Sequence, residues 1–411
     1  MLNQFFDARW LNYWKLRASA AQVGSTLGAY DTNMYYSVSN SNKYNSFAAS
    51  YRRTSLIDPD IQPTLSTSYE VGTEFRLFNN RLWGDINFYT IDTKNQILNM
   101  DVAPQSGYAT RQINSGLVRN RGIEISLGGT PVKTRNFTWN IDMNLARNVN
   151  TLVSLNKDID RYQLDWFSFQ YRYYYWAVVG QPLGTISSMA RFARDDQGRM
   201  ILEPSTSSWY GGGYAPVVEE NVEKEIGNFQ PDLTGGFSTS LRYKNLTLAA
   251  NFDFMIGGKM ISITNMWSTG SGTSAATAKL NNNGINEREP INKGGGVYIE
   301  GVDTEGNPVN AYMNAYGYYH DMADFGMDEF LYDRTYFKMR ELSVGYNFPK
   351  ALLQKAGIGL NSASLSFVAS NPWLIYSACP NVDPSEAGSN WIESGQAAST
   401  RTFGFTLKLG F

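Results

Sequence analysis

Two chemically important residue types are almost absent from this chain. Its 411 residues include a single cysteine, Cys379, and a single histidine, His320. One cysteine excludes a disulfide within the chain, and one histidine excludes zinc sites built from several histidines. A serine–histidine–aspartate mechanism would depend on His320, and no Gly-x-Ser-x-Gly motif accompanies it. We therefore expect no catalytic residues, no cofactor and a protein that is not an enzyme.

Long hydrophobic runs and an excess of one charge are also missing. No stretch approaches the roughly 18 apolar residues of a membrane-spanning helix. The 35 basic and 37 acidic residues give a formal net charge of -2, which gives no reason to expect a nucleic-acid partner. Residues Met1–Arg9 lack the basic, apolar and small-residue pattern of a secretion signal. Since an exported chain needs such a signal, we expect either the rear part of a longer protein or a cytoplasmic protein.

The final residues alternate between apolar and small or polar side chains. Every second position is apolar, at Phe403, Phe405, Leu407, Leu409 and Phe411. Alternation with period two puts these side chains on one face of a β-strand. A strand of about ten residues with one apolar face is typical of a transmembrane β-barrel, which hydropathy misses because the other face is polar. The aromatic C-terminal residue also resembles the last strand of bacterial outer-membrane barrels, which the assembly machinery recognises.

The same alternation recurs along the chain and predicts an all-β, antiparallel transmembrane barrel. Short turns such as Asn79-Asn80 separate some segments and predict β-hairpins. We count roughly a dozen strands, a number that suits a large barrel. We expect long connections without regular structure at 187–234, 257–333 and 372–400, and no helix beyond a short turn at 350–356. Short periplasmic turns and long extracellular loops are the usual asymmetry of outer-membrane barrels.

Aromatic residues are the candidates for binding. We expect Trp209, Tyr210 and Trp391, all in the long loops, to contact a ligand or a partner that covers the loops. The aromatic run between Trp166 and Trp176 is a stacking surface for sugar rings, an interfacial girdle or ordinary strand packing. We favour the last two interpretations.

Oxygen-rich segments are the only candidates for a metal. The turns Asp303–Asn307 and Asp195–Gly198 are possible calcium sites, although neither has the spacing of an EF-hand loop. The acidic group formed by Asp321, Asp324, Asp328 and Glu329 is solvated surface or a contact for an ion or a partner, and we favour solvated surface. Polar residues that alternate with apolar ones in the strands, such as Asp85, are expected to line the channel.

Several longer motifs resemble the SusC/RagA-type TonB-dependent transporters. The stretch Asn114–Leu127 resembles a hallmark sequence of that family. Further matching stretches follow in the family's order along nearly the whole chain: Pro182–Ile186, Ile226–Phe237, Phe254–Lys259, Tyr336–Pro349 and Pro380–Pro384. One departure comes after Ile186, where Ser187-Ser188-Met189 replaces the family's usual aromatic–glycine stretch.

This resemblance implies that residues 1–411 are the C-terminal part of an outer-membrane barrel of about 22 strands. The N-terminal plug domain, the TonB box and the first strands are then expected outside this sequence. The family imports oligosaccharides or peptides into bacteria and pairs with a SusD-like surface lipoprotein that covers the barrel. The expected partners are that lipoprotein, the N-terminal portion of the transporter, TonB through that portion, the lipid bilayer, and a glycan or peptide ligand.

Two other interpretations fit part of the pattern. A secreted β-rich adhesin or glycan-binding module would pack its apolar strand faces against another sheet rather than against lipid. An outer-membrane enzyme would depend on His320. In the barrel interpretation, the missing strands leave two edges whose unpaired N–H and C=O groups cost several kcal/mol each in lipid. We therefore expect that this chain does not form a stable membrane barrel alone.

Overall fold

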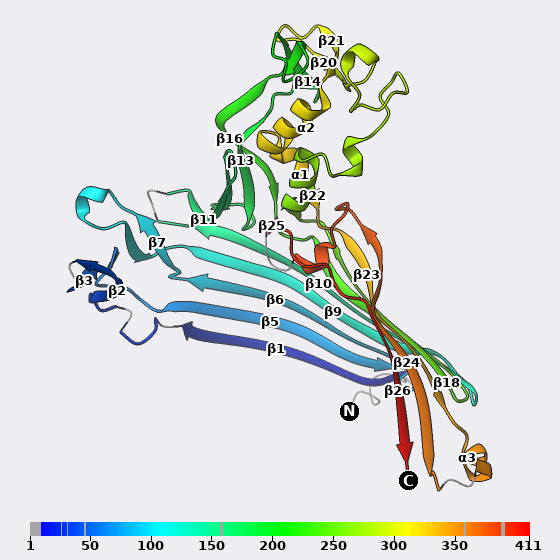
Figure 1. The fold of residues 1–411 in the computed structure, drawn as a ribbon. Helices are drawn as coiled ribbons and strands as arrows, with labels where there is room; N and C mark the ends of the chain where they lie inside the picture. The colour runs from blue at the N-terminus through cyan, green and yellow to red at the C-terminus, as the bar shows by residue number, and fades with distance from the viewer. Residues whose placement is uncertain are drawn as a thin grey trace.

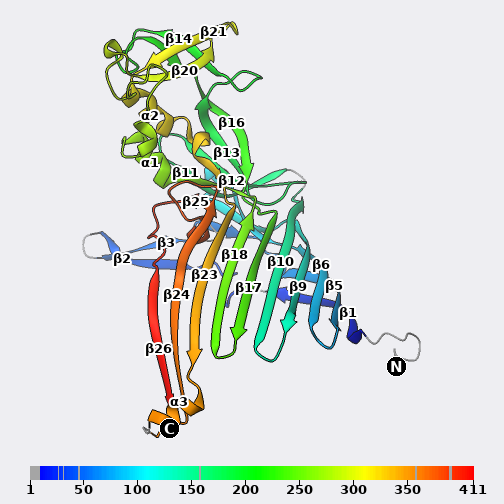
Figure 2. The same ribbon diagram turned by 90° about the vertical axis from the view of Figure 1, so that its right-hand side faces the viewer.

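The computed structural model describes residues 10–25, 27–30, 32–44, 47–156, 159–356, 359–387 and 391–411. Its largest element is a ten-stranded antiparallel sheet that curves like a section of a barrel wall (Figures 1 and 2). The strands follow one another across the sheet in chain order, so the sheet is an up-and-down meander. They are β1 (Leu11–Ser25), β5 (Thr64–Leu77), β6 (Leu82–Lys94), β9 (Leu117–Lys133), β10 (Phe137–Ser154), β17 (Leu233–Tyr243), β18 (Leu246–Ile256), β23 (Tyr336–Asn347), β24 (Ser362–Ser377) and β26 (Thr402–Gly410).

The alternating sequence gives this wall an apolar outer face. Phe405 of β26 lies opposite Phe367 of β24, which lies opposite Val344 of β23. Cross-strand partners share a face, so these side chains form one apolar row, and Phe405 is 76% exposed. The prediction of an antiparallel all-β fold with an alternating terminal strand is therefore confirmed.

The opposite, inner face of the wall carries paired charges. Arg17 of β1 donates two hydrogen bonds to Asp85 of β6, with Nη2 and Oδ1 2.6 Å apart. The arginine reaches across β5 at Gly72, where a Cβ atom would lie only 2.8 Å from its guanidinium. A second bidentate pair, between Arg119 of β9 and Asp92 of β6 with both N–O distances 2.6 Å, lies on the other face, in line with Phe88 and Ile123 and near the strand ends that lead to the loops. Asp85 thus lies on the polar face, as the alternation predicted.

Tight turns join the strands at one end of the wall. Between β5 and β6, Phe78, Asn79 and Asn80 all have positive φ angles of 55°, 56° and 59°. Two- and three-residue turns also join β17 to β18 and β9 to β10. The helix α3 (Lys350–Ala356) lies between β23 and β24 at the same end (Figure 2), which confirms the short helical turn predicted at 350–356.

At the other end, the connections fold instead of forming irregular loops. The connections after β10, β18 and β24 build a domain that stands on the wall (Figure 1). We call this the loop domain: the described residues of 155–232, 257–335 and 378–401. Its strands are β11 (Arg161–Ser168), β12 (Arg172–Val178), β13 (Thr185–Phe192), β14 (Met200–Ser205), β15 (Gly213–Pro216), β16 (Val218–Asn228), β19 (Lys259–Ser262), β20 (Val297–Val302), β21 (Pro308–Met313), β22 (Leu331–Asp333) and β25 (Ile392–Glu393). The connections after β1 and β6 contain β2 (Tyr36–Tyr44), β3 (Phe47–Arg52), β4 (Ser55–Ile57), β7 (Ile97–Asp101) and β8 (Thr110–Asn114).

The loop domain also contains two helices that the sequence did not predict. They are α1 (Ile263–Gly270) and α2 (Ala315–Asp324). Each begins at a polar capping residue, because the side chains of Ser262 and Asn314 accept hydrogen bonds from backbone N–H groups in the first turn. The expectation of long structureless loops was wrong. Helices of eight and ten residues are too short to show a clear apolar period, and burial in the loop domain stabilises them.

Two clusters of buried side chains hold the loop domain together. One contains Leu202 and Met313, and the other contains Tyr173 and Met266. Met322 of α2 packs against both clusters and connects them. Each large apolar side chain that is fully buried contributes about 1.5–3 kcal/mol. The loop domain therefore has a core of its own, and it holds its side chains in fixed positions above the wall.

The wall is an open sheet within the part of the chain that the structure describes. There β1 pairs only with β5, and β26 pairs only with β24. Both outer strands thus have one edge without a partner strand, as expected for a section of a larger barrel. Among the described residues, no helix combines the length and apolar character needed to cross a membrane.

Candidate functional site

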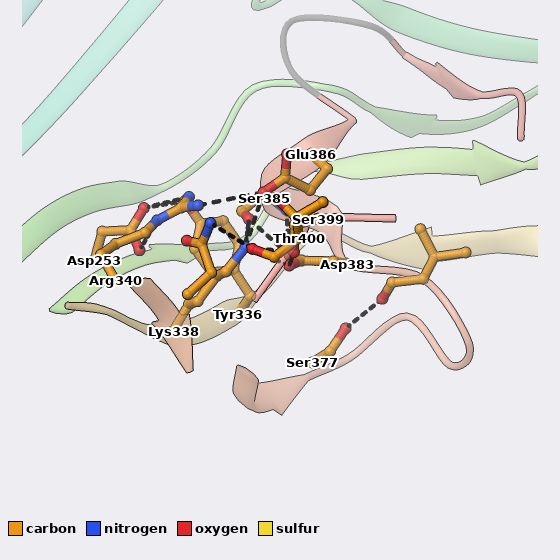
Figure 3. A network of polar contacts seen from close by, with 12 residues as sticks. Asp253, Tyr336, Lys338, Arg340, Ser377, Asp383, Ser385, Glu386, Ser399 and Thr400 are labelled. Carbon is orange, nitrogen blue, oxygen red and sulfur yellow. Dashed lines mark hydrogen bonds and ion pairs between the residues drawn. The ribbon is translucent and has the colours of Figure 1, made fainter. Parts of the chain in front are cut away.

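A buried lysine lies where the loop domain meets the wall (Figure 3). Lys338 of β23 is 1% exposed. Its Nζ atom is 2.6 Å from Asp383 Oδ2 and 2.8 Å from Glu386 Oε1. The hydroxyl oxygens of Ser385 and Ser399 complete its surroundings, each at 3.2 Å. The ammonium group is therefore fully paired by the connection between β24 and β26.

Arg340 extends this network to the neighbouring strand. Its Nε and Nη2 atoms donate hydrogen bonds to the two oxygens of Asp253 on β18, both at 2.8 Å. Its Nη1 atom lies 3.3 Å from Glu386 Oε1, and the Tyr336 hydroxyl donates to Asp253 Oδ2 at 3.1 Å. We call these residues, with Lys338, Asp383, Ser385 and Ser399, the Lys338 network.

The Lys338 network fixes a charged segment in place. Burial alone would raise the pKa of Asp383, but hydrogen bonds from Lys338 and Ser385 lower it below its ordinary value. Asp383 also accepts a hydrogen bond from the Ser385 backbone N–H at 3.0 Å, which caps the 3-10 helix Pro384–Glu386. A buried charge that loses its partner costs about 3–5 kcal/mol. The described residues of this connection, 383–387 and 391–399, are therefore held firmly against β23, and we refer to these residues as the segment 383–399.

A cavity of about 520 Å³ lies beside this network. Charged and apolar side chains both line it, among them Lys338, Glu386, Glu393, Arg401 and Leu374. The volume falls in the range of roughly 300–1,000 Å³ that is usual for small-ligand sites. The mixed lining suits a ligand that carries hydroxyl or amide groups, which makes this cavity the candidate binding site.

Glu393 fixes one border of the cavity. It is 2% exposed, and its carboxylate accepts hydrogen bonds from Thr264 Oγ1 (2.6 Å), Ser262 Oγ (2.7 Å) and the Gly395 N–H (2.7 Å). A carboxylate at the start of α1 is also favoured by the helix dipole. Glu393 thus joins β25 to α1 and orders this side of the cavity.

Two of the three aromatic residues predicted to bind lie inside the loop domain. Trp391 is 3% exposed, stacks on Tyr175 with centroids 5.5 Å apart, and donates from Nε1 to Asp165 Oδ2 at 2.9 Å. Tyr210 is 9% exposed, and its hydroxyl donates to Asp321. Tertiary packing buries both rings, and contact of these two residues with a ligand or a covering partner stays an untested prediction. Trp209 is only partly buried, so the prediction for Trp209 stays open.

The aromatic run predicted between Trp166 and Trp176 forms β11, β12 and the turn between them. Both strands belong to a sheet of the loop domain. Tyr173 is completely buried, and the rings of Tyr174 and Trp176 lie 5.2 Å apart. This placement agrees with strand packing, one of the two interpretations favoured from the sequence.

In both oxygen-rich turns, the aspartate side chain accepts hydrogen bonds from backbone N–H groups of the same turn. Asp303 accepts hydrogen bonds from the backbone N–H groups of Glu305 and Asn307, both at 2.9 Å. Asp195 does the same with Gln197 and Arg199. These bonds stabilise the turns and account for aspartate at both positions. Calcium binding there stays an untested prediction.

Asp328 provides a pH-dependent prediction for the loop domain. Its Oδ1 atom is shielded from solvent and has no hydrogen-bond partner among the described residues. Burial, together with neighbouring Glu329, raises the pKa of Asp328 to about 6. The folded state then keeps a proton that the unfolded state loses near pH 4, so stability falls as the pH rises from about 4 to 6.

We expect Asp328→Asn to stabilise the loop domain by about 1–3 kcal/mol at pH 7.5 and to leave it nearly unchanged at pH 4. Thermal unfolding at both pH values measures this difference. Asp303→Asn is the control. Hydrogen bonds from Asn307 lower the pKa of Asp303, so removing the Asp303 carboxylate should not stabilise the protein. Equal melting temperatures for Asp328→Asn and the parent protein at pH 7.5 would contradict the prediction.

Comparison with known proteins identifies the wall. The family model for TonB dependent receptor-like β-barrels matches residues 5–254. The TonB-dependent receptor P3 of Formosa agariphila is 25% identical to this chain, over 98% of the chain and 40% of the receptor. The TonB-dependent receptor SusC of Bacteroides thetaiotaomicron is 25% identical over 29% of the chain and 12% of SusC.

A solved structure shows the same fold. The structure of the RagAB peptide transporter superposes on the whole chain with a TM-score of 0.71 and 19% identity. The match covers 42% of that transporter chain and 40% of the P3 receptor, so this chain spans about two-fifths of the length of each. The family match covers more than half of the chain, and the antiparallel wall agrees with it. The chain therefore belongs to the TonB-dependent receptor-like β-barrel family, whose members are receptors and transporters rather than enzymes.

Proposed function

We propose that this chain forms part of the wall and extracellular cap of a nutrient importer in the bacterial outer membrane. The observation that carries the proposal is the two-faced wall: its outer face is apolar, its inner face bears ion pairs, and an ordered domain covers one end. An apolar outer band and a polar interior are what a barrel in lipid requires. The similarity to SusC and to the RagAB peptide transporter supports the same assignment.

The remaining strands and the plug are proposed to come from the rest of the transporter. The unpaired edges of β1 and β26 are where those strands would add. TonB would act through that portion. A SusD-like lipoprotein would dock on the loop domain, where the partly exposed Trp209 and its neighbour Tyr316 offer aromatic surface. The cargo is an oligosaccharide or a peptide.

The alternative is a secreted glycan-binding module or adhesin. Such a protein would cover its apolar strand faces with a second sheet. In the described part of the chain, the other sheets belong to the loop domain or to the connections after β1 and β6. In the row that contains Phe405, that ring is 76% exposed and Phe367 and Val344 are only partly buried, which favours lipid as the partner of this face.

Purification from native outer membranes tests the proposal. We expect the tagged protein to be recovered in detergent with a plug-bearing N-terminal portion and a SusD-like lipoprotein, both detected by mass spectrometry. Growth on candidate glycans and peptides after deletion of the gene then identifies the cargo. Recovery from the soluble fraction without these partners would reject the importer and favour the secreted module.

A further inference from the structure

The only histidine of the chain lies between two carboxylates on α2. His320 Nδ1 is 3.4 Å from Asp321 Oδ1 and 3.4 Å from Asp324 Oδ2. His320 and Asp324 are four residues apart, so they share one face of the helix. This is the spacing at which two helical side chains bind one metal ion in the His-Glu-x-x-His motif. One donor atom from each of the three residues lies within 4.8 Å of the other two.

The Nδ1 atom of His320 is buried but has no hydrogen-bond partner among the described residues. Both nearby carboxylate oxygens are too far away or poorly aligned to accept its proton. Donor atoms that share a zinc ion at about 2.0–2.2 Å lie about 3.0–3.5 Å apart. The two distances around Nδ1 match that separation.

Neighbouring residues hold these donors in position. The Tyr210 hydroxyl donates a hydrogen bond to Asp321 Oδ2, which leaves Oδ1 directed towards the histidine. The ring of Trp209 meets the His320 ring edge-on, with centroids 5.2 Å apart. Outer residues that orient ligands in this way are a regular feature of metal sites.

We propose that His320, Asp321 and Asp324 form a binding site for a divalent transition-metal ion such as Zn²⁺. One imidazole nitrogen and two carboxylate oxygens suit zinc, which takes nitrogen and oxygen ligands in groups of three or four. Calcium prefers six to eight oxygen ligands. Since Tyr210 binds Asp321, a bound ion would tie α2 to the Trp209–Tyr210 segment and stabilise this part of the loop domain.

Isothermal titration of the complete transporter in detergent tests this site, with chelator-treated protein and zinc chloride. We expect the number of zinc ions bound per molecule to be higher by one for the parent protein than for the variant His320→Ala. Asp324→Asn and Tyr210→Phe should each lower the affinity of this site for zinc by at least about tenfold. Asp303→Asn, which removes a carboxylate from an exposed turn of the same domain, is the matched control and should bind zinc like the parent.

Two readouts separate ligand loss from misfolding. In the presence of chelator, His320→Ala should melt at the parent's temperature. Added zinc should raise the melting temperature of the parent but not of His320→Ala. Equal zinc stoichiometry in the parent and His320→Ala would overturn the proposal. So would a site that takes Ca²⁺ and not Zn²⁺. Neither outcome bears on membrane import, which the purification experiment tests separately.

Discussion

Replacing Lys338 with Met releases the segment 383–399 from the wall. The ammonium group is the main partner of Asp383, and its loss leaves that carboxylate, which is 14% exposed, without a counter-charge. Glu386 keeps Arg340 as a partner at 3.3 Å, so most of the penalty comes from Asp383. We expect a local destabilisation of about 3–5 kcal/mol. Hydrogen exchange of the complete transporter in detergent measures it as lost protection in 383–399.

The matched control is Lys259→Met. Lys259 also pairs with an aspartate, Asp333, but at 3.5 Å, and both side chains are more than a third exposed. An exposed ion pair of this kind contributes about 0–1 kcal/mol. The double variant Lys338→Met/Asp383→Asn should recover part of the lost protection, because it removes the unpaired charge. If Lys338→Met exchanged like Lys259→Met, the Lys338 network would not be what holds the segment.

Lys338→Met should also reduce import of the cargo. Lys338, Asp383 and Glu386 all line the 520 Å³ cavity. When the segment 383–399 detaches, the cavity loses one wall, and a ligand bound there loses contacts. Import by Lys338→Met should therefore fall below that of Lys259→Met at equal amounts of protein in the outer membrane. This comparison tests whether the cavity is on the path of the cargo.

The strands of the wall could be predicted because their signal is local. Alternation along a strand such as β26 follows directly from one face in lipid and one in the lumen. The Lys338 network shows the limit of this reasoning. The position of Lys338 between Phe337 and Met339 could place it on the polar face of β23, but its partners Asp383 and Ser399 lie 45 and 61 residues further along. No short-range pattern connects them.

The loop domain was predicted less well, for a related reason. Trp391 and Tyr210 were selected as contact residues because they lie in long connections, and nothing in the sequence indicated that their rings are buried. Their burial depends on contacts with Tyr175 and Asp321, which are distant in sequence. The capping residues Ser262 and Asn314 were visible signals for α1 and α2. Without a long apolar period after them, they were not enough to predict helices.

Replacing Phe405 with Arg should largely prevent assembly of the barrel. Phe405 lies near the middle of β26, on the apolar row with Phe367. An arginine facing lipid near the middle of the bilayer costs about 2–4 kcal/mol. It also interrupts the alternating terminal strand on which assembly is expected to depend. We expect a clear loss of folded transporter, measured as the heat-modifiable band in outer-membrane fractions.

The neighbouring residue, Thr406, provides a control because its side chain points to the opposite face of β26. Thr406 is also exposed, but it lies on the opposite face of β26, opposite Ser366 of β24. Thr406→Arg introduces the same charge into the lumen, where water and polar groups solvate it, so assembly should remain close to normal. A secreted module would behave differently, since an arginine at a water-exposed Phe405 costs little. Equal assembly of both variants would therefore reject lipid as the partner of this face, and loss of Phe405→Arg alone would establish which side of the wall meets the membrane.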